Sequence, residues 1–506
     1  MTHKNSSSQA KYGALISYFS IAFYVISGFL YTPFLISKLG MSDYGIFTMS
    51  LSVIAYFTMD FGIGSALTRF IARYLAEDNE KQVKNLVGLT LKLYLVIDFI
   101  ILLALIIVYC YSDSIFTSLS AEELERFKVV FVITASFVVV SFPLLPLNGI
   151  FLAYERIIAV QSIELFTKII NVCMLVTSLI VGYGLLGVVL VTSVVTISSQ
   201  AIKLIYLRKK VGLGCNIRYY DKDLLQSIGS FSLWATVASI ADKFFFPIIP
   251  FILAIVSNTR EIALFAIVTS IEGYVLTVAR AMNGIFLPKV MKLVVYKSLG
   301  EELTDLMIKV GRVQLYIVGL LITVLIIMGK DFIVLWVGHD FSNSYLPMVI
   351  VLIPCLFHFT TSIAEELILA KNLVKYRALI YTLGSLVNVS FVFLLSGEFG
   401  ALGAGIAVSL SYILAYNILA AIIYKKKLGL DVLSFYKRCH LSILPAIICV
   451  IVLCFFMFAQ ITFYHPIIDF VIKTIIVCIL VVTLYWTICM NKEEKNIVKS
   501  IILKIK

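Results

Sequence analysis

The chain has 506 residues, of which 61% are hydrophobic and only 14% are charged, and its mean hydropathy is +1.02. A water-soluble protein could not keep such a chain dispersed, so the composition excludes a soluble globular architecture. The nine cysteines occur singly along the chain, without the paired spacing of a metal site or a disulfide framework, and we expect neither.

Apolar stretches long enough to cross a bilayer recur from Tyr12 to Met490. A spanning helix needs about 20 predominantly apolar residues, so we predict an all-α integral membrane protein with fourteen transmembrane helices. The first apolar run is too long for the core of a signal peptide, and we expect it to be retained. The expected spans are 13–37, 44–68, 87–110, 128–152, 158–181, 184–207, 229–256, 261–287, 313–337, 346–370, 376–396, 400–424, 441–463 and 467–490.

The net charge of +12 follows the predicted membrane topology and gives no reason to expect a nucleic-acid partner. With fourteen spans, both tails and the loops after even-numbered spans lie on one side of the membrane. Basic residues concentrate in loops that face the cytoplasm, so this asymmetry places both termini in the cytoplasm. Of the 41 Lys and Arg residues, the loops on the other side hold only Lys38, Arg126, Lys128, Arg260 and Lys330.

The sequence repeats itself with an offset of about 217 residues, as transporters with duplicated halves do. Pro33 to Ser37 matches Pro250 to Ala254, which strengthens the case for a shared hinge at the two prolines, although generic helix kinks remain the default expectation. Each half closes with Gly-x-x-Gly, an apolar run, a basic triplet and Gly-Leu, at 184–213 and again at 400–430. We therefore predict two pseudo-symmetric six-helix lobes facing a cleft, residues 1–213 and 214–430, followed by an appended helix pair and tail, residues 431–506.

Lys243 and Arg280 lie inside the predicted spans, and neither has an opposite charge three or four residues away on the same helix. A charge near the bilayer centre costs at least about 2.5–3.5 kcal/mol, so each must face protein or a wet cavity. Two interpretations remain open. The cations pair with carboxylates of neighbouring helices, or they form a site for an anionic headgroup in which Arg280 offers a bidentate fork to phosphate.

Buried carboxylates that titrate near neutral pH can carry coupling ions, although each one can equally serve only to neutralise a cation. The candidates are Asp60, Asp242, Glu272, Glu365 and Glu366. Glu164 and Lys168 lie four residues apart, the favourable spacing for an ion pair on one helix, and we expect them to pair. For His358 we expect a neutral ring bonded to a nearby hydroxyl such as that of Thr361 rather than a proton relay.

Four segments near the N-terminus carry a family resemblance: Tyr31–Gly40, with the sequence YTPFLISKLG, then Asp43–Gly45, Asp60–Gly64 and Thr68–Arg69. They resemble the polysaccharide-repeat flippases, of the O-antigen type, within the multidrug/oligosaccharidyl-lipid/polysaccharide exporter superfamily. The resemblance extends over the whole chain, including the six-plus-six repeat and the extra helix pair.

This resemblance implies a bacterial inner-membrane protein that moves an undecaprenyl-diphosphate-linked oligosaccharide from the cytoplasmic to the periplasmic leaflet. The family works by alternating access of two lobes, driven by a proton or sodium gradient and without a bound cofactor. On this basis Arg280 and Lys243 would contact the diphosphate and the buried carboxylates would couple to ions. A polysaccharide polymerase and a chain-length regulator are the implied protein partners, beside the lipid-linked oligosaccharide and membrane lipids.

Three other functions deserve comparison. A multidrug or cation exporter of the same superfamily needs twelve spans and an acidic cavity, so the extra helix pair and the two cations argue against it. A membrane enzyme, either a repeat-unit polymerase or an acyltransferase, is disfavoured because the longest external loop carries one arginine, Arg126. A non-transporting scaffold would not retain so many charges in the membrane. We therefore expect a transporter, with no catalytic residue and no metal site.

Overall fold

The computed structural model of the protein describes residues 3–59, 61–281, 300–371, 373–458 and 465–505. Within these ranges every regular element is a helix. Eleven helices are long and apolar enough to cross a membrane, and the number rises to twelve if the bent pair Lys222–Gly229 and Ser232–Lys243 counts as one span. The prediction of a multi-pass α-helical membrane protein is confirmed, while the number of fourteen spans stays a prediction.

Two of these eleven segments, Phe19–Phe57 and Val374–Leu428, each cover two of the predicted spans. In each, the chain changes direction at a glycine, Gly40 with φ of 76° and Gly400 with φ of 53°. Positive φ is a backbone region that glycine reaches without the steric cost of a side chain. These glycines therefore let one helix follow another without an intervening loop.

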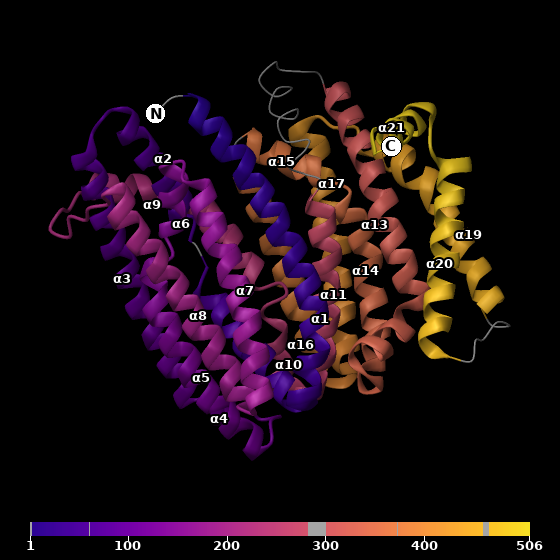
Figure 1. Ribbon diagram of the computed structural model, residues 1–506, viewed down its shortest axis with the longest axis horizontal. Helices are drawn as coiled ribbons and strands as arrows, with labels where there is room; N and C mark the ends of the chain where they lie inside the picture. The colour runs from indigo at the N-terminus through magenta and orange to yellow at the C-terminus, as the bar shows by residue number, and fades with distance from the viewer. Residues whose placement is uncertain (1–2, 60, 282–299, 372, 459–464, 506) are drawn as a thin grey trace. The chain divides into compact units, whose positions relative to one another are not determined.

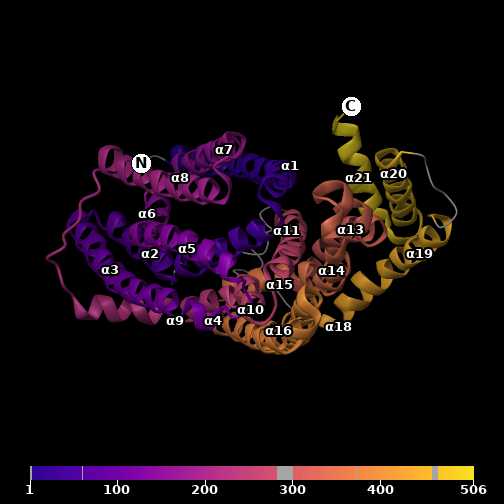
Figure 2. The same ribbon diagram turned by 90° about the horizontal axis from the view of Figure 1, so that it is seen from below.

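The chain divides into two compact units, and the first comprises Met1–Ala266 and Ser385–Ala404. Within it α1 packs along α5 and α7, α7 along α8, and α2 against α3, α6 and α9; α7 and α8 run side by side in Figures 1 and 2. Its helices are α1 (His3–Phe57), α2 (Ile63–Ala76), α3 (Glu80–Cys110), α4 (Ser112–Ile115), α5 (Ala121–Ser141), η1 (Phe142–Leu144), α6 (Leu147–Ala153), α7 (Ile157–Val181), α8 (Gly184–Tyr206), η2 (Leu207–Val211), α9 (Lys222–Lys243) and α10 (Ile249–Val256).

The second unit comprises Ile267–Gly384 and Gly405–Lys506. Its central helix α13 packs against α14, α19 and α20. The boundaries between the two units fall within α11 and α16, whereas the predicted repeat boundaries after residues 213 and 430 stay a prediction. The remaining helices are α11 (Thr259–Ala281), α13 (Gly300–Val337), η3 (His339–Ser344), α14 (Tyr345–Phe359), α15 (Ser362–Ala370), α16 (Val374–Ser411), η4 (Tyr412–Leu419), α17 (Ala420–Ile423), η5 (Tyr424–Leu428), α18 (Val432–Phe435), η6 (Tyr436–His440), α19 (Leu441–Phe458), α20 (Pro466–Leu484), η7 (Tyr485–Cys489) and α21 (Lys492–Ile505).

The repeat seen in the sequence has a counterpart in the local backbone. The basic triplets lie in η2 and η5, which are both π-helical turns of five residues. Each turn ends at a left-handed glycine, Gly212 with φ of 73° and Gly429 with φ of 72°. The helices that open the two closing segments begin at Gly184 and Gly400, with φ of 54° and 53°. Equivalent glycines of the two halves thus all have positive φ.

The repeat-related prolines do not behave alike. Pro33 lies inside α1, which continues past it without a break, whereas Pro250 lies in the first turn of α10, after the irregular segment 244–248. The two prolines thus occupy different positions in their helices, and the shared hinge stays a prediction. Proline is tolerated in the first helical turn because that amide has no intrahelical partner, and within membrane helices neighbours accommodate the missing bond.

Candidate functional site

Five ionisable side chains of the second unit gather around α11, and we call them the Arg280 cluster. α11 carries Glu272 and Arg280, α14 carries His358 near its end, and α15 carries the adjacent Glu365 and Glu366. Three of the five predicted carboxylates and one of the two predicted cations therefore come from three helices of one unit.

Glu272 is the most deeply buried member, with 3% of its surface exposed. Tyr412 of η4 donates its hydroxyl hydrogen bond to Glu272 Oε1 over 3.1 Å. The buried Cys355 lies close enough to interact electrostatically with this carboxyl group. A carboxyl group with one neutral donor is weakly partnered for its burial, because an ionised carboxylate can accept up to about four hydrogen bonds.

His358 faces Glu365, with 3.7 Å between Nε2 and Oε1. This distance is longer than a hydrogen bond, and Nδ1 has no partner among the described residues. The expected bond between the ring and Thr361 is wrong: the Thr361 hydroxyl donates instead to the backbone carbonyl of His358 over 2.8 Å. Threonine in a helix commonly bonds a carbonyl one turn back, which removes its hydroxyl from competition. The ring packs between Tyr412 and Tyr416, with centroid separations of 5.4 and 5.0 Å.

Arg280 lies near the end of α11 with its side chain exposed, and it forms no ion pair within the described ranges. Its charge acts electrostatically on Glu272, His358 and Glu366. Eight residues separate it from Glu272, which corresponds to about 12 Å along a helix. The guanidinium is thus close enough to hold negative charge in this part of the unit while keeping its own donors open to a ligand.

The remaining predicted site residues belong to the first unit or fall outside the described ranges. Asp242 and Lys243 end α9, Asp242 exposed and Lys243 half-buried, and neither forms an ion pair with another described residue. Asp60 lies outside the described residues. The roles assigned to Lys243, Asp242 and Asp60 therefore stay predictions.

The expected pair between Glu164 and Lys168 is wrong. Glu164 pairs with Lys203 of α8, with 3.1 Å between Oε1 and Nζ, and Lys203 also donates to Asn148 Oδ1 over 2.8 Å. Lys168 instead donates to Ser20 Oγ of α1 over 3.2 Å. Lys203 comes from another helix and its side chain is only 4% exposed. A carboxylate partner therefore stabilises the charge of Lys203 more than it would stabilise that of the half-exposed Lys168 on its own helix. In the sequence, the position of Lys203 inside the predicted span 184–207 could have indicated that it needs a carboxylate partner such as Glu164.

Arg312 is the second important charge that the sequence pattern missed. It appeared to precede a span, but α13 begins at Gly300, so Arg312 lies within the helix and is 8% exposed. Its guanidinium donates to Glu494 Oε1 over 2.6 Å and to Glu494 Oε2 over 3.0 Å. It also donates to the carbonyls of Arg438 and Cys489 and to the hydroxyls of Ser442 and Tyr316, all within 2.7 Å. This set, which we call the Arg312 node, joins α13 to η6, α19, η7 and α21.

No group of three or more His, Cys, Asp or Glu side chains among the described residues is arranged to hold a metal ion. The candidate site therefore consists of side-chain charges and hydroxyls alone. Side chains of these types can bind anions through a guanidinium and can exchange ions at weakly partnered carboxyl groups.

Three solved structures share this fold over most of their length. The inward closed conformation of the lipid II flippase MurJ gives a TM-score of 0.71 at 13% sequence identity, covering 94% of this chain and 98% of that one. An inward-facing multidrug resistance MATE family transporter of the MOP superfamily gives 0.60 at 13% identity, covering 82% and 99%. The Vibrio cholerae MATE transporter VcmN in its bent form gives 0.53 at 15% identity, covering 86% and 99%. No curated protein sequence matches this chain.

The fold is thus that of the flippase MurJ and of the MATE transporters. A family model described as polysaccharide biosynthesis protein matches residues 13–288, more than half of the chain. The chain belongs to that family. The resemblance predicted from the N-terminal segments is confirmed, and the protein is a multi-pass α-helical membrane protein of the polysaccharide biosynthesis family.

Proposed function

We propose that this protein is a flippase for an undecaprenyl-diphosphate-linked oligosaccharide, such as an O-antigen or another surface polysaccharide repeat unit. It would move this substrate from the cytoplasmic to the periplasmic leaflet of the bacterial inner membrane by alternating access, with both termini in the cytoplasm. The observation that carries the proposal is the family membership over residues 13–288 together with the MurJ-like fold.

Arg280 is the residue that we assign to the diphosphate. Its exposed guanidinium has no ion-pair partner among the described residues and lies in a unit rich in tyrosines and carboxyl groups. A guanidinium matches two phosphate oxygens with parallel hydrogen bonds, which makes arginine better suited to a diphosphate than a point charge. Lys243 remains a separate candidate for phosphate contact, to be tested by its own substitution.

The weakly partnered carboxyl groups support ion coupling by H⁺ or Na⁺. Glu272 has one neutral donor, and Glu365 lies beyond hydrogen-bonding distance of His358. A carboxyl group that is neither fully paired nor solvated changes its ionisation state readily when its surroundings change. Asp242, Glu366 and Asp60 are further candidates. A polysaccharide polymerase and a chain-length regulator are the expected protein partners.

Deletion of the protein, followed by localisation of the lipid-linked oligosaccharide, tests the proposal. A flippase predicts accumulation on the cytoplasmic leaflet. Unpolymerised repeats outside the membrane would indicate a polymerase. An unchanged glycolipid pool with increased drug sensitivity would favour the multidrug exporter, which the MATE-like fold makes the second candidate.

The site itself is tested by restoring the deleted strain with variants. Arg280→Ala is expected to abolish surface polysaccharide although the protein still inserts. Arg438→Ala is the matched control, because Arg438 belongs to the same unit and forms an exposed pair with Asp305 over 2.8 Å. Near-normal polymer from Arg280→Ala would remove Arg280 from the site.

A further inference from the structure

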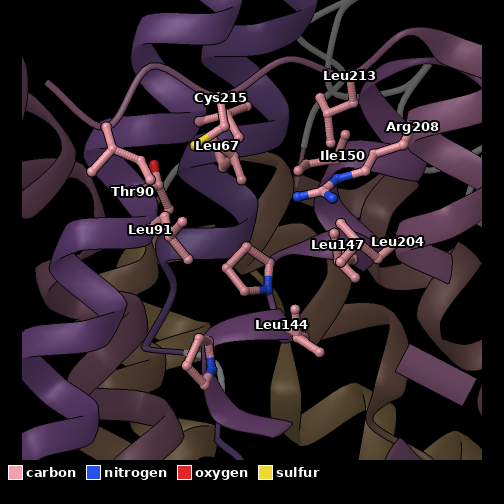
Figure 3. A pocket seen from close by; sticks show the side chains of 14 residues that line it. Leu67, Thr90, Leu91, Leu144, Leu147, Ile150, Leu204, Arg208, Leu213 and Cys215 are labelled. Atoms are coloured by element: carbon pink, nitrogen blue, oxygen red, sulfur yellow. The ribbon is translucent and has the colours of Figure 1, made fainter. Parts of the chain in front are cut away.

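The first unit contains a cavity of about 480 Å³ that plays no part in the Arg280 cluster. It lies between α2, α3, η1, α6 and the end of α8, and its volume is in the range of small-molecule sites. Figure 3 shows the lining side chains, which are mainly aliphatic. Those used below are Leu67, Thr90, Leu147, Leu204, Arg208 and Cys215.

Two polar groups of the cavity lack partners. The Arg208 guanidinium reaches toward the lining side chains in Figure 3, and it forms no ion pair with another described residue. Thr90 is 2% exposed, and its hydroxyl has no hydrogen-bond partner within the described ranges. A buried hydroxyl normally bonds the carbonyl one turn back or another group, so the Thr90 hydroxyl can donate to a ligand that enters the cavity.

One wall of the cavity is the connection between η2 and α9, which joins the two predicted repeats. Leu213, Cys215 and Ile217 of this connection line the cavity. The connection is fixed to α3 because the Asn216 amide donates to the Lys84 carbonyl over 3.0 Å and its side chain donates to Asn85 Oδ1 over 2.7 Å. A ligand in the cavity would therefore contact both the membrane helices and the connection between the repeats.

We propose that this cavity binds one anionic glycerophospholipid, with its phosphate at Arg208 and the start of an acyl chain against Leu67, Leu147 and Leu204. Basic sites between membrane helices on the cytoplasmic side are suited to anionic headgroups. The predicted topology places the end of α8 on that side. The proposal is independent of the flippase function and concerns a resident lipid that stabilises the connection between the repeats.

The chemistry of the cavity favours a glycerophospholipid over a polyprenyl diphosphate. A single guanidinium complements the single charge of a phosphodiester. Below its phosphate a glycerophospholipid carries ester carbonyls, which accept hydrogen bonds. The Thr90 hydroxyl is a donor without a partner, and a polyprenyl chain offers it nothing because that chain is pure hydrocarbon.

The test uses the full-length protein in phosphatidylcholine nanodiscs containing phosphatidylglycerol with a photoreactive acyl chain. Irradiation followed by peptide mapping is expected to label the segment 204–217. Arg208→Gln is expected to lower this labelling roughly tenfold and Thr90→Val severalfold, because each removes a direct hydrogen bond to the lipid. Lys210→Gln is the matched control, since Lys210 belongs to the same exposed triplet but does not line the cavity, and its labelling should equal that of the unmodified protein.

A second measurement uses Cys215 in a variant that retains only Cys215 and Cys110. Both thiols are exposed, Cys110 is the last residue of α3, and only Cys215 lines the cavity. Phosphatidylglycerol is expected to slow maleimide modification of Cys215 severalfold and to leave the modification of Cys110 unchanged. Equal labelling of Arg208→Gln and Lys210→Gln, or equal protection of the two cysteines, would overturn the proposal.

A competition experiment distinguishes a bound glycerophospholipid from a bound polyprenyl lipid. If undecaprenyl diphosphate displaces the photoreactive phosphatidylglycerol at lower concentration than unlabelled phosphatidylglycerol does, the cavity holds a polyprenyl lipid and our assignment is wrong. Flipping measured on the same samples separates the two hypotheses, because a protein that binds this lipid without flipping oligosaccharide would contradict the proposed function alone.

Discussion

Two arginines of the second unit, Arg312 and Arg280, occupy contrasting surroundings. Arg312 is buried, and its guanidinium donates hydrogen bonds to a carboxylate, two carbonyls and two hydroxyls. Arg280 is exposed and has no ion pair among the described residues, although it acts electrostatically on Glu272 and Glu366. The contrast teaches that charge in a membrane helix is not by itself a sign of function. A fully partnered cation holds helices together, whereas a cation with open donors can receive a ligand.

The largest effect is expected from breaking the Arg312 node. Arg312→Met should lower the free energy of unfolding by about 3–5 kcal/mol, because it leaves Glu494 with a buried, unpaired charge. Thermal unfolding in detergent measures the change. Lys309→Met on the same helix is the control, since Lys309 and Glu493 form an exposed pair and exposed pairs contribute about 0–1 kcal/mol. Equal losses from both variants would show that burial does not distinguish the two pairs.

The next largest effect is the loss of folding stability at low pH. Burial opposes ionisation of Glu494, but the hydrogen bonds from Arg312 outweigh it and hold the Glu494 pKa below its ordinary value. A carboxyl group with a lowered folded-state pKa contributes stability above its unfolded pKa of about 4.3, and this contribution is lost as pH falls through the folded-state value. Unfolding measured from pH 6 to pH 3 should show a loss of about 1.5–3 kcal/mol, the size of a charge-assisted hydrogen bond. Glu494→Gln should flatten this dependence, and an unchanged slope would contradict the assignment.

Arg280→Lys tests whether transport needs the bidentate guanidinium of Arg280 or only its positive charge. Lysine keeps the charge but loses the bidentate fork, so we expect oligosaccharide flipping in reconstituted vesicles to fall roughly tenfold, equivalent to about 1.4 kcal/mol. The unfolding temperature should stay unchanged because Arg280 has no described ion pair to lose. Full activity of Arg280→Lys would mean that a point charge suffices.

Glu272→Gln tests ion coupling and is expected to change stability only slightly. The amide keeps an acceptor for Tyr412, so stability should change by about 1 kcal/mol or less. The variant removes a titratable group, and the pH dependence of flipping should disappear if Glu272 couples transport to protons. Tyr412→Phe is the companion variant, since it removes the hydrogen bond and keeps the carboxyl group. Unchanged pH dependence in Glu272→Gln excludes Glu272 as the coupling residue.

The sequence by itself determined the helical membrane class, because hydropathy over about 20 residues depends only on composition. It also determined the family, from the segments near Tyr31 and Asp43, and the glycines that end the basic turns at Gly212 and Gly429, since positive φ is a local demand. Arg280 and Glu272 were found because an isolated charge in an apolar run is visible without knowledge of its neighbours.

Only the tertiary structure decided which charges are partnered. Glu164 was within reach of Lys168 along its own helix, yet it pairs with Lys203 from α8, because helix packing brings residues 39 positions apart into contact and excludes water from them. Arg312 became buried once α13 extended to Gly300 and met α21. Periodicity assigns a side chain to a helix face, but the partner on that face depends on which other helix packs there.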